Sequence, residues 1–422
     1  MNNLTFGFFK KYFKKGFVRN VLITSSGVFF GFIVNFAIQP FITRIYSAEM
    51  IGTVALLVSF VGLLNISSSF SYDMAIMRAD SVEEASKLTL ISLCILILFS
   101  SIVSIILGTS FDSLFGRTKY NVLNDLIIFI PIFLLMKGLI KITQNLLIRT
   151  GDFKNHSVSD ALKTTSPAML KIIFGKVLSP TTFLLLISTL IGSLLNGIFL
   201  LNSLIKQKIK FSFTGVLDIL KKYRKYPMIF NWNNLLNSLA QQSTILLLGF
   251  YYDISQIGYY SLAMSVILMP IGFMSNSIFK VYLPNITTKY KNGLDLMGDF
   301  RKLMIVQLLI GAILFITLFV LAPFLFEFVF GKEWRQSGIF VRLLTPWMFM
   351  MFLNKPSNAI IQLHEKFKFL SIYNVIILIL RVCAIFLGFI IYNDILWSIG
   401  LFSLVGFLCN FYFIIYSIKI IR

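Results

Sequence analysis

The sequence has 422 residues, of which 57% are hydrophobic and only 13% are charged, and its formal net charge is +21. Soluble domains carry about 25% charged residues, so this composition excludes a soluble enzyme or binding domain over most of the chain. We assign the positive charge to the ends of membrane spans and not to a nucleic-acid surface, because no basic stretch interleaved with aromatic residues occurs.

Apolar runs of span length predict an all-α polytopic membrane protein with about twelve transmembrane helices. The first run is too long for the core of a signal peptide, so we expect it to be retained as a span. The fifth run is the least apolar, because it contains Lys163, Pro167 and Lys171. The expected spans lie at 20–44, 51–77, 87–108, 122–148, 157–177, 181–205, 227–251, 257–283, 303–326, 338–363, 369–391 and 394–418.

The Lys and Arg residues outside these spans are concentrated in every second connection. The positive-inside rule therefore predicts an inner-membrane protein with both termini in the cytoplasm. The longest connection is a basic loop near the middle of the chain. We expect an N-terminal six-helix half at 1–205, a basic cytoplasmic linker at 206–226 and a C-terminal six-helix half at 227–422. No phosphate-binding loop of an ATPase is present.

The two halves resemble each other in sequence. Tyr46 and Gly52 after the first span recur as Tyr252 and Gly258 after the seventh. Further pairs at nearly constant offset are Phe115-Gly116 with Phe330-Gly331, Pro131 with Pro346, and Lys141 with Lys355. This pattern indicates a duplication. Six spans are an even number, so the repeats share one orientation, and we expect a pseudo-two-fold axis along the membrane normal with a shared site between the halves.

Polar side chains inside the spans indicate which helix faces are internal, because a charge at mid-helix costs at least ~2.5–3.5 kcal/mol in hydrocarbon. Asp73 is the carboxylate well inside a span, and we interpret it either as an ion-coupling site or as a static partner of Arg78 or Lys141. Single amides can also simply bond a neighbouring helix, and Lys137 can reach the interface. The candidate cavity residues are Lys141, Lys355, Arg381, Lys280, Lys137, Arg78, Asn145, Asn234, Gln241 and Asn358.

The predicted cavity is cationic, which suits a phosphate or pyrophosphate ligand held by charge-assisted hydrogen bonds. No catalytic residues, metal ligands or cofactor are expected. The three cysteines lie inside apolar runs, and His156 and His364 lie at span ends without a nucleophile nearby.

Four segments of the chain resemble bacterial polysaccharide flippases of the multidrug/oligosaccharidyl-lipid/polysaccharide (MATE-like) exporter superfamily. They are residues 41–52 (FITRIYSAEMIG), 72–76 (YDMAI), 257–263 (IGYYSLA) and 331–338 (GKEWRQSG). The resemblance implies a MATE-like pair of six-helix bundles. It also implies alternating-access export of undecaprenyl-pyrophosphate-linked O-antigen, lipopolysaccharide or capsule repeat units. The implied partners are membrane lipid, H⁺ or Na⁺ in antiport, and other polysaccharide-assembly membrane proteins. Asp73 departs from the Glu common at that position in the family.

Three alternatives remain open at this point. A MATE-type multidrug antiporter would need a less basic cavity for lipophilic cations. A membrane-embedded polysaccharide polymerase or ligase would be expected to have a long external loop, which this chain lacks. A peptidoglycan-precursor flippase would be expected to have fourteen spans instead of twelve.

Overall fold

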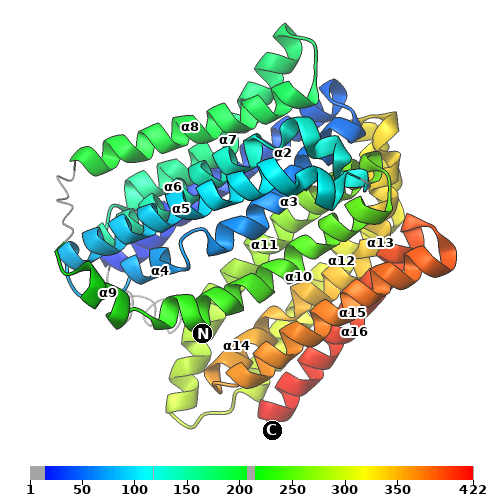
Figure 1. Cartoon of the computed structure of the whole chain (residues 1–422). Coiled ribbons are helices and arrows are strands. Elements are labelled where there is room, and N and C mark those ends of the chain that lie inside the picture. Colours follow the sequence, from blue (N-terminus) through cyan, green and yellow to red (C-terminus); the bar gives the residue numbers. More distant parts are fainter. Residues whose placement is uncertain (1–14, 117, 207–213, 422) are drawn as a thin grey trace. The chain divides into compact units, whose positions relative to one another are not determined.

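The computed structural model describes residues 15–116, 118–206 and 214–421, and all regular secondary structure in these residues is helical (Figure 1). Each expected span coincides with one helix or with two consecutive helical segments. The elements are α2 (Lys15–Ile45), α3 (Ala48–Ser67), α4 (Tyr72–Ile76), α5 (Val82–Phe115), η1 (Lys119–Leu126), α6 (Phe129–Thr150), α7 (Phe153–Val177), α8 (Thr182–Lys206), α9 (Val216–Lys222), η2 (Tyr226–Phe230), α10 (Asn231–Tyr251), α11 (Ile254–Lys291), α12 (Met297–Phe330), η3 (Lys332–Trp334), α13 (Arg335–Leu353), α14 (Lys355–Leu363), α15 (Phe367–Tyr392) and α16 (Ile395–Ile421).

Nine candidate spans in the described residues are long and apolar enough to cross a membrane. The prediction of a helical multi-pass membrane protein is therefore confirmed. The expected spans that correspond to α7, α10 and α11 are not among the nine. Polar residues explain this for α7, which carries Lys163 and Lys171, and for α10, which begins with three asparagines and a tryptophan. The count of twelve spans stays a prediction.

The chain forms two compact units whose boundaries do not follow the sequence halves. Unit 1 contains residues 1–45, 64–111 and 125–232, and unit 2 contains residues 46–63, 112–124 and 233–422. The beginning of α3 and most of η1 thus pack with the second half of the sequence. The expected linker at 206–226 contains the short helix α9, while residues 207–213 lie outside the described residues.

Unit 1 packs its helices closely at small residues. Gly27 and Gly31 of α2 lie against Ser157 and Thr164 of α7, and Gly192 of α8 lies against the ring of Pro167 in α7. A Cβ at any of these glycines would overlap its neighbour. Helices in lipid gain stability from such close contact, because there is no hydrophobic effect between them. Glycine at these positions therefore sets the spacing of α2, α7 and α8.

Two expected spans are interrupted in the structure. The span at 51–77 ends as a regular helix at Ser67, and Phe70 and Ser71 then adopt left-handed φ values of 46° and 60°. The span at 338–363 divides at Asn354 into α13 and α14, with a proline in the first turn of α14. Proline cannot donate a backbone hydrogen bond, which accounts for the second break. Both interruptions are corrections to the continuous helices expected from the sequence.

Unit 2 contains a pair of helix crossings that mirror each other. Gly52 of α3 lies against the carbonyl oxygen of Ile254, and Gly258 of α11 lies against the carbonyl oxygen of Ala48. Ala48 precedes Gly52 by four residues, just as Ile254 precedes Gly258. The duplicated segments after spans one and seven are therefore in reciprocal contact, which agrees with the repeat inferred from the sequence.

Candidate functional site

The carboxylate of Asp73 lies at the centre of a polar cluster in unit 1. Asp73 is fully buried on α4, directly after the interruption at Phe70 and Ser71. Ser69 Oγ donates a hydrogen bond of 2.5 Å to its Oδ1. Lys141 Nζ of α6 lies 3.1 Å from Oδ2, and Asn145 Nδ2 donates to the same oxygen at 3.1 Å. Both carboxylate oxygens are thus hydrogen-bonded, and the charge is paired.

The polar stripe of α6 holds the segment around α4. Asn145 Nδ2 also donates to the backbone carbonyl of Asp73 at 3.1 Å, and Arg149 Nε donates to the carbonyl of Ala79 at 3.0 Å. Lys141, Asn145 and Arg149 are spaced by four residues, so they share one helix face. The i+4 pattern in the sequence thus corresponds to a face that bonds one neighbouring segment. Of the two interpretations of Asp73, the static contact with Lys141 is present, whereas Arg78 is exposed and makes no ion pair among the described residues.

The break between α3 and α4 is bridged by one asparagine of α10. Asn231 Nδ2 donates to Ser67 Oγ at 3.2 Å, and Ser71 Oγ donates to Asn231 Oδ1 at 3.3 Å. Left-handed φ values are uncommon for residues other than glycine. The two hydrogen bonds join the last residue of α3 to the residue before α4. Asn231 therefore stabilises the backbone that positions Asp73.

Further basic residues of unit 1 lie near this cluster. Lys137 is one helical turn before Lys141 on α6, and it experiences the like charge of Lys163 on α7. Neither lysine forms an ion pair with a carboxylate in the part of the chain that the structure describes. Lys163 is exposed, and it was not among the sequence candidates.

Arg381 of α15 is a basic residue of unit 2 that is packed between aromatic rings. Its guanidinium carbon lies 4.6 Å from the ring centre of Trp347 and 4.7 Å from that of Phe402. The two rings are themselves in edge contact at 5.1 Å. Its Nε is buried without a hydrogen-bond partner, and no carboxylate pairs with it within the described ranges. Cation–π contact stabilises the charge only partly, so Arg381 retains capacity to bind an anion.

The remaining candidates of the second half are spread over several helices. Lys355 begins α14, and Asn358 accepts a 2.7 Å hydrogen bond from Gln362 one turn later. Asn234 is half-buried and Gln241 is exposed on α10. The side chain of Lys280 lies outside the described residues. No group of three His, Cys, Asp or Glu residues that could hold a metal was found among the residues searched.

Two charged residues on predicted spans that bond neighbouring groups were missed by the sequence reasoning. Asp160 of α7 accepts a 3.0 Å hydrogen bond from Gln144 Nε2 and lies 3.4 Å from His156 Nδ1. Arg342 of α13 donates to the carbonyls of Phe319 and Val320 at 2.8 and 3.0 Å. Both carbonyls belong to α12, which contains Pro323. Proline has no backbone N–H, so Pro323 cannot donate to the carbonyl of Phe319 four residues earlier. A proline inside a span is the signal that could have identified Arg342 as a structural cation.

Three of the four segments that carry the family resemblance contribute residues to one region of unit 2. The backbone N–H of Ala48 lies 3.5 Å from Glu333 Oε1, and Gly258 packs against Ala48. The rings of Tyr259 and Trp334 are in edge contact at 5.6 Å. Residues 46–52, 257–263 and 331–338 therefore form one packed region.

The last part of the basic linker is attached to unit 1. Lys222 of α9 lies 2.7 Å from Asp80 and 2.5 Å from Glu84. Tyr72 Oη of α4 donates to the carbonyl of Leu220 at 3.5 Å. The hydrogen bonds to the two carboxylates raise the pKa of Lys222, and the hydrogen bond and charge of Lys222 lower the pKa of Asp80. The α9 segment is thus held against the Asp73-bearing helix and the start of α5.

Comparison with known proteins relates the chain to polysaccharide biosynthesis proteins. The family model described as "Polysaccharide biosynthesis protein" matches residues 41–339. The amylovoran biosynthesis protein AmsL of Erwinia amylovora is 26% identical over 120 residues, which is 28% of this chain and 31% of that protein. The chain therefore aligns with less than a third of that relative.

Two solved structures share the fold over nearly the whole chain. An inward-facing multidrug resistance MATE family transporter of the MOP superfamily has a TM-score of 0.74 at 15% identity, covering 93% of this chain and 94% of the other. The lipid II flippase MurJ in an inward closed conformation has a TM-score of 0.77 at 16% identity, covering 94% and 87%. At these identities the likeness establishes the fold alone, and it confirms the expected MATE-like architecture.

Proposed function

The chain belongs to the polysaccharide biosynthesis protein family, and we propose that it is a flippase for lipid-linked oligosaccharide repeat units. Its cargo would be an oligosaccharide on an undecaprenyl-pyrophosphate carrier, moved across the bacterial inner membrane by alternating access. A glycan headgroup cannot cross hydrocarbon unaided, because its polar groups would lose water without replacement. A polar protein interior removes that barrier while the lipid tail stays in the bilayer.

The observation that carries this proposal is that the membrane helices contain more basic side chains than carboxylates that pair with them. Asp73 pairs with Lys141, whereas no carboxylate pairs with Lys137, Lys355 or Arg381 among the residues that the structure describes. Ionisable residues within membrane helices mark substrate or ion pathways by default. Lys and Arg bind phosphate oxygens through short, charge-assisted hydrogen bonds. The balance of charge therefore favours an anionic headgroup.

The same balance disfavours the multidrug antiporter. A lipophilic cation would be repelled by unpaired lysines and arginine, although one structural neighbour is a multidrug resistance transporter. Two solved structures with the same fold are a multidrug resistance transporter and a lipid II flippase, which supports transport over polymerisation or ligation. We accordingly propose transport without covalent chemistry on the glycan.

For the coupling step we propose that H⁺ or Na⁺ replaces the ammonium group of Lys141 at the carboxylate of Asp73. With Asp73 ionised, the ammonium of Lys141 is held 3.1 Å from its carboxylate. Binding of H⁺ or Na⁺ at Asp73 would neutralise the carboxylate and release Lys141 to pair with a substrate phosphate. Release of the cation would restore the ion pair and expel the anion. This exchange links the two ligands thermodynamically.

The function is tested by locating the lipid-linked glycan in cells. The gene is deleted in its host and restored from a plasmid, and surface polysaccharide is measured by immunoblot. In spheroplasts, an impermeant lectin reports the lipid-linked oligosaccharide on the outer face of the inner membrane. We expect the deletion to remove lectin binding and the plasmid to restore it. Outer-face labelling at the parental rate in the deletion strain would refute the proposal.

A further inference from the structure

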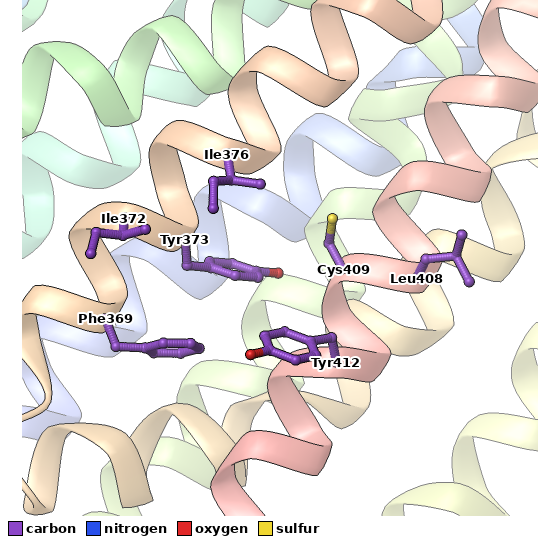
Figure 2. A pocket seen from close by; sticks show the side chains of 7 residues that line it. All are labelled: Phe369, Ile372, Tyr373, Ile376, Leu408, Cys409 and Tyr412. Carbon is purple, nitrogen blue, oxygen red and sulfur yellow. The ribbon is translucent and has the colours of Figure 1, made fainter.

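An apolar groove runs between α15 and α16 in unit 2. It has a volume of about 330 Å³ and is lined by Phe369, Ile372 and Ile376 on α15 and by Leu408 and Tyr412 on α16 (Figure 2). Ile372, Leu408 and Tyr412 are each more than half exposed, so the groove opens to the surroundings of the helix pair. A water molecule occupies about 30 Å³ in the liquid, so the groove has room for roughly ten methylene-sized groups.

Aromatic rings form the floor and one end of this groove. Phe369 stacks on Tyr416 at 3.8 Å and on Tyr373 at 6.0 Å, and Tyr373 contacts Phe413 at 4.9 Å. Tyr373 projects from α15 toward Cys409 of α16 in Figure 2, and its hydroxyl is buried without a hydrogen-bond partner. Ring faces offer flat, polarisable contacts along which unsaturated hydrocarbon can pack. The groove can therefore hold part of an unsaturated hydrocarbon chain.

Two lysines extend the groove beyond its aromatic end. Lys368 precedes Ile372 by four residues and Ile376 by eight, so it lies on the groove-lining face of α15. Lys419 follows Tyr412 by seven residues and lies on the groove-lining face of α16. Both lysines are exposed, and neither forms an ion pair among the described residues. At 1.5 Å per residue they stand about 6 Å and about 10 Å beyond Ile372 and Tyr412.

We propose that this groove, with Lys368 and Lys419 at its end, binds the polyprenyl chain and the proximal phosphate of the lipid carrier before the headgroup enters the transporter. The proposal rests on the proposed function for its choice of lipid. An apolar slot that ends at unpaired lysines complements a lipid whose phosphate joins a long hydrocarbon chain. Basic sites between membrane helices are known to hold phosphate-bearing lipid headgroups. The aromatic lining selects the unsaturated isoprenoid over saturated acyl chains.

The test measures binding of a diazirine-labelled polyprenyl phosphate to the full-length protein in phosphatidylcholine nanodiscs. Photo-crosslinking should label peptides of α15 and α16. Ile372→Trp fills the groove and should weaken binding at least about fivefold. Ile390→Trp is the matched control, because it changes an isoleucine of similar exposure on the same helix (59% against 60%). The two positions are about 27 Å apart along the helix axis.

Charge variants provide a second measurement that cannot fail through misfolding, since the residues are exposed. Lys368→Gln and Lys419→Gln should each weaken binding about fivefold, the equivalent of about 1 kcal/mol per lysine near a lipid phosphate. Lys302→Gln at the start of α12 is the control and should bind like the parent protein. Competition with unlabelled lipids then identifies the occupant, and polyprenyl phosphate should displace the probe far better than phosphatidylglycerol.

Equal binding by Ile372→Trp and Ile390→Trp would overturn the proposal, and so would equal displacement by phosphatidylglycerol, which would indicate ordinary boundary lipid. The lectin assay in spheroplasts separates this outcome from a failure of the function. Normal outer-face glycan together with unaltered lipid binding by the Ile372→Trp protein would refute the proposed lipid site and support the flippase function. Groove-specific lipid binding without glycan export supports the groove and refutes the flippase.

Discussion

Replacing Lys141 by Gln should destabilise the protein strongly, because it leaves a buried carboxylate without its counter-charge. Asp73 is fully buried, and Lys141 Nζ lies 3.1 Å from Oδ2. Removing one partner of a buried ion pair typically costs about 3–5 kcal/mol, whereas replacing both can be nearly neutral. The side chain of Lys141 is 32% exposed, and Ser69 and Asn145 would still donate to the carboxylate, so the expected loss is at the lower end, about 3 kcal/mol.

The assay is reversible unfolding in mixed micelles, read as a double-mutant cycle. Lys141→Gln and Asp73→Asn are measured singly and together, and Lys163→Gln serves as a control at an exposed lysine of α7. The double variant should recover most of the loss of Lys141→Gln, with a coupling energy of up to about 3 kcal/mol. The control should change stability by no more than about 0.5 kcal/mol. A Lys141→Gln protein as stable as the parent, or additive single effects, would refute the buried pair.

Three further outcomes are expected. Gly258→Leu should lower the free energy of unfolding in detergent by about 1–3 kcal/mol, because the leucine overpacks against Ala48. Gly272→Leu is the control and should not, because a Cβ at Gly272 meets nothing within 4 Å. Equal melting temperatures of the two variants would contradict the close crossing. Arg381→Gln should reduce surface glycan while the protein remains in the membrane at normal amounts, and full export would exclude Arg381 from the substrate path. A cysteine introduced at Ser255 should react with an impermeant thiol reagent in whole cells. A cysteine introduced at Ser212, which lies outside the described residues, should not react. Labelling at Ser212 would overturn the cytoplasmic placement of the linker.

The helical architecture was predictable because apolar length alone specifies it in lipid. Every apolar run of span length in the sequence corresponds to helix in the structure. The break before Asp73 was not predictable, because Phe70 and Ser71 adopt left-handed conformations without a glycine to signal them. The break at α14 had a visible signal in Pro356, but a proline inside a span can also kink a continuous helix.

The candidate site was only partly accessible from sequence, since residue spacing gives a helix face but not its partner. The stripe of Lys141 and Asn145 was visible, and its contact with Asp73 was one of two interpretations. Whether a buried cation is paired depends on helices far away in the sequence. Arg342 shows the difficulty, because it bonds carbonyls on a neighbouring helix and carries no motif of its own. The roles of Lys355 and Arg381 in substrate binding remain predictions.

The reciprocal contact of Gly52 and Gly258 has a consequence for the ancestry of the chain. Ala48 meets Gly258 while Ile254 meets Gly52, so each copy of the repeat offers the other the same surface. This arrangement defines an isologous interface, the form by which identical subunits associate about a two-fold axis. This reciprocal form is the one that a duplicated half-length sequence predicts. Ala48 and Ile254 occupy equivalent positions and carry different side chains, so the contact depends on the backbone carbonyl and the opposing glycine and tolerates a change of side chain.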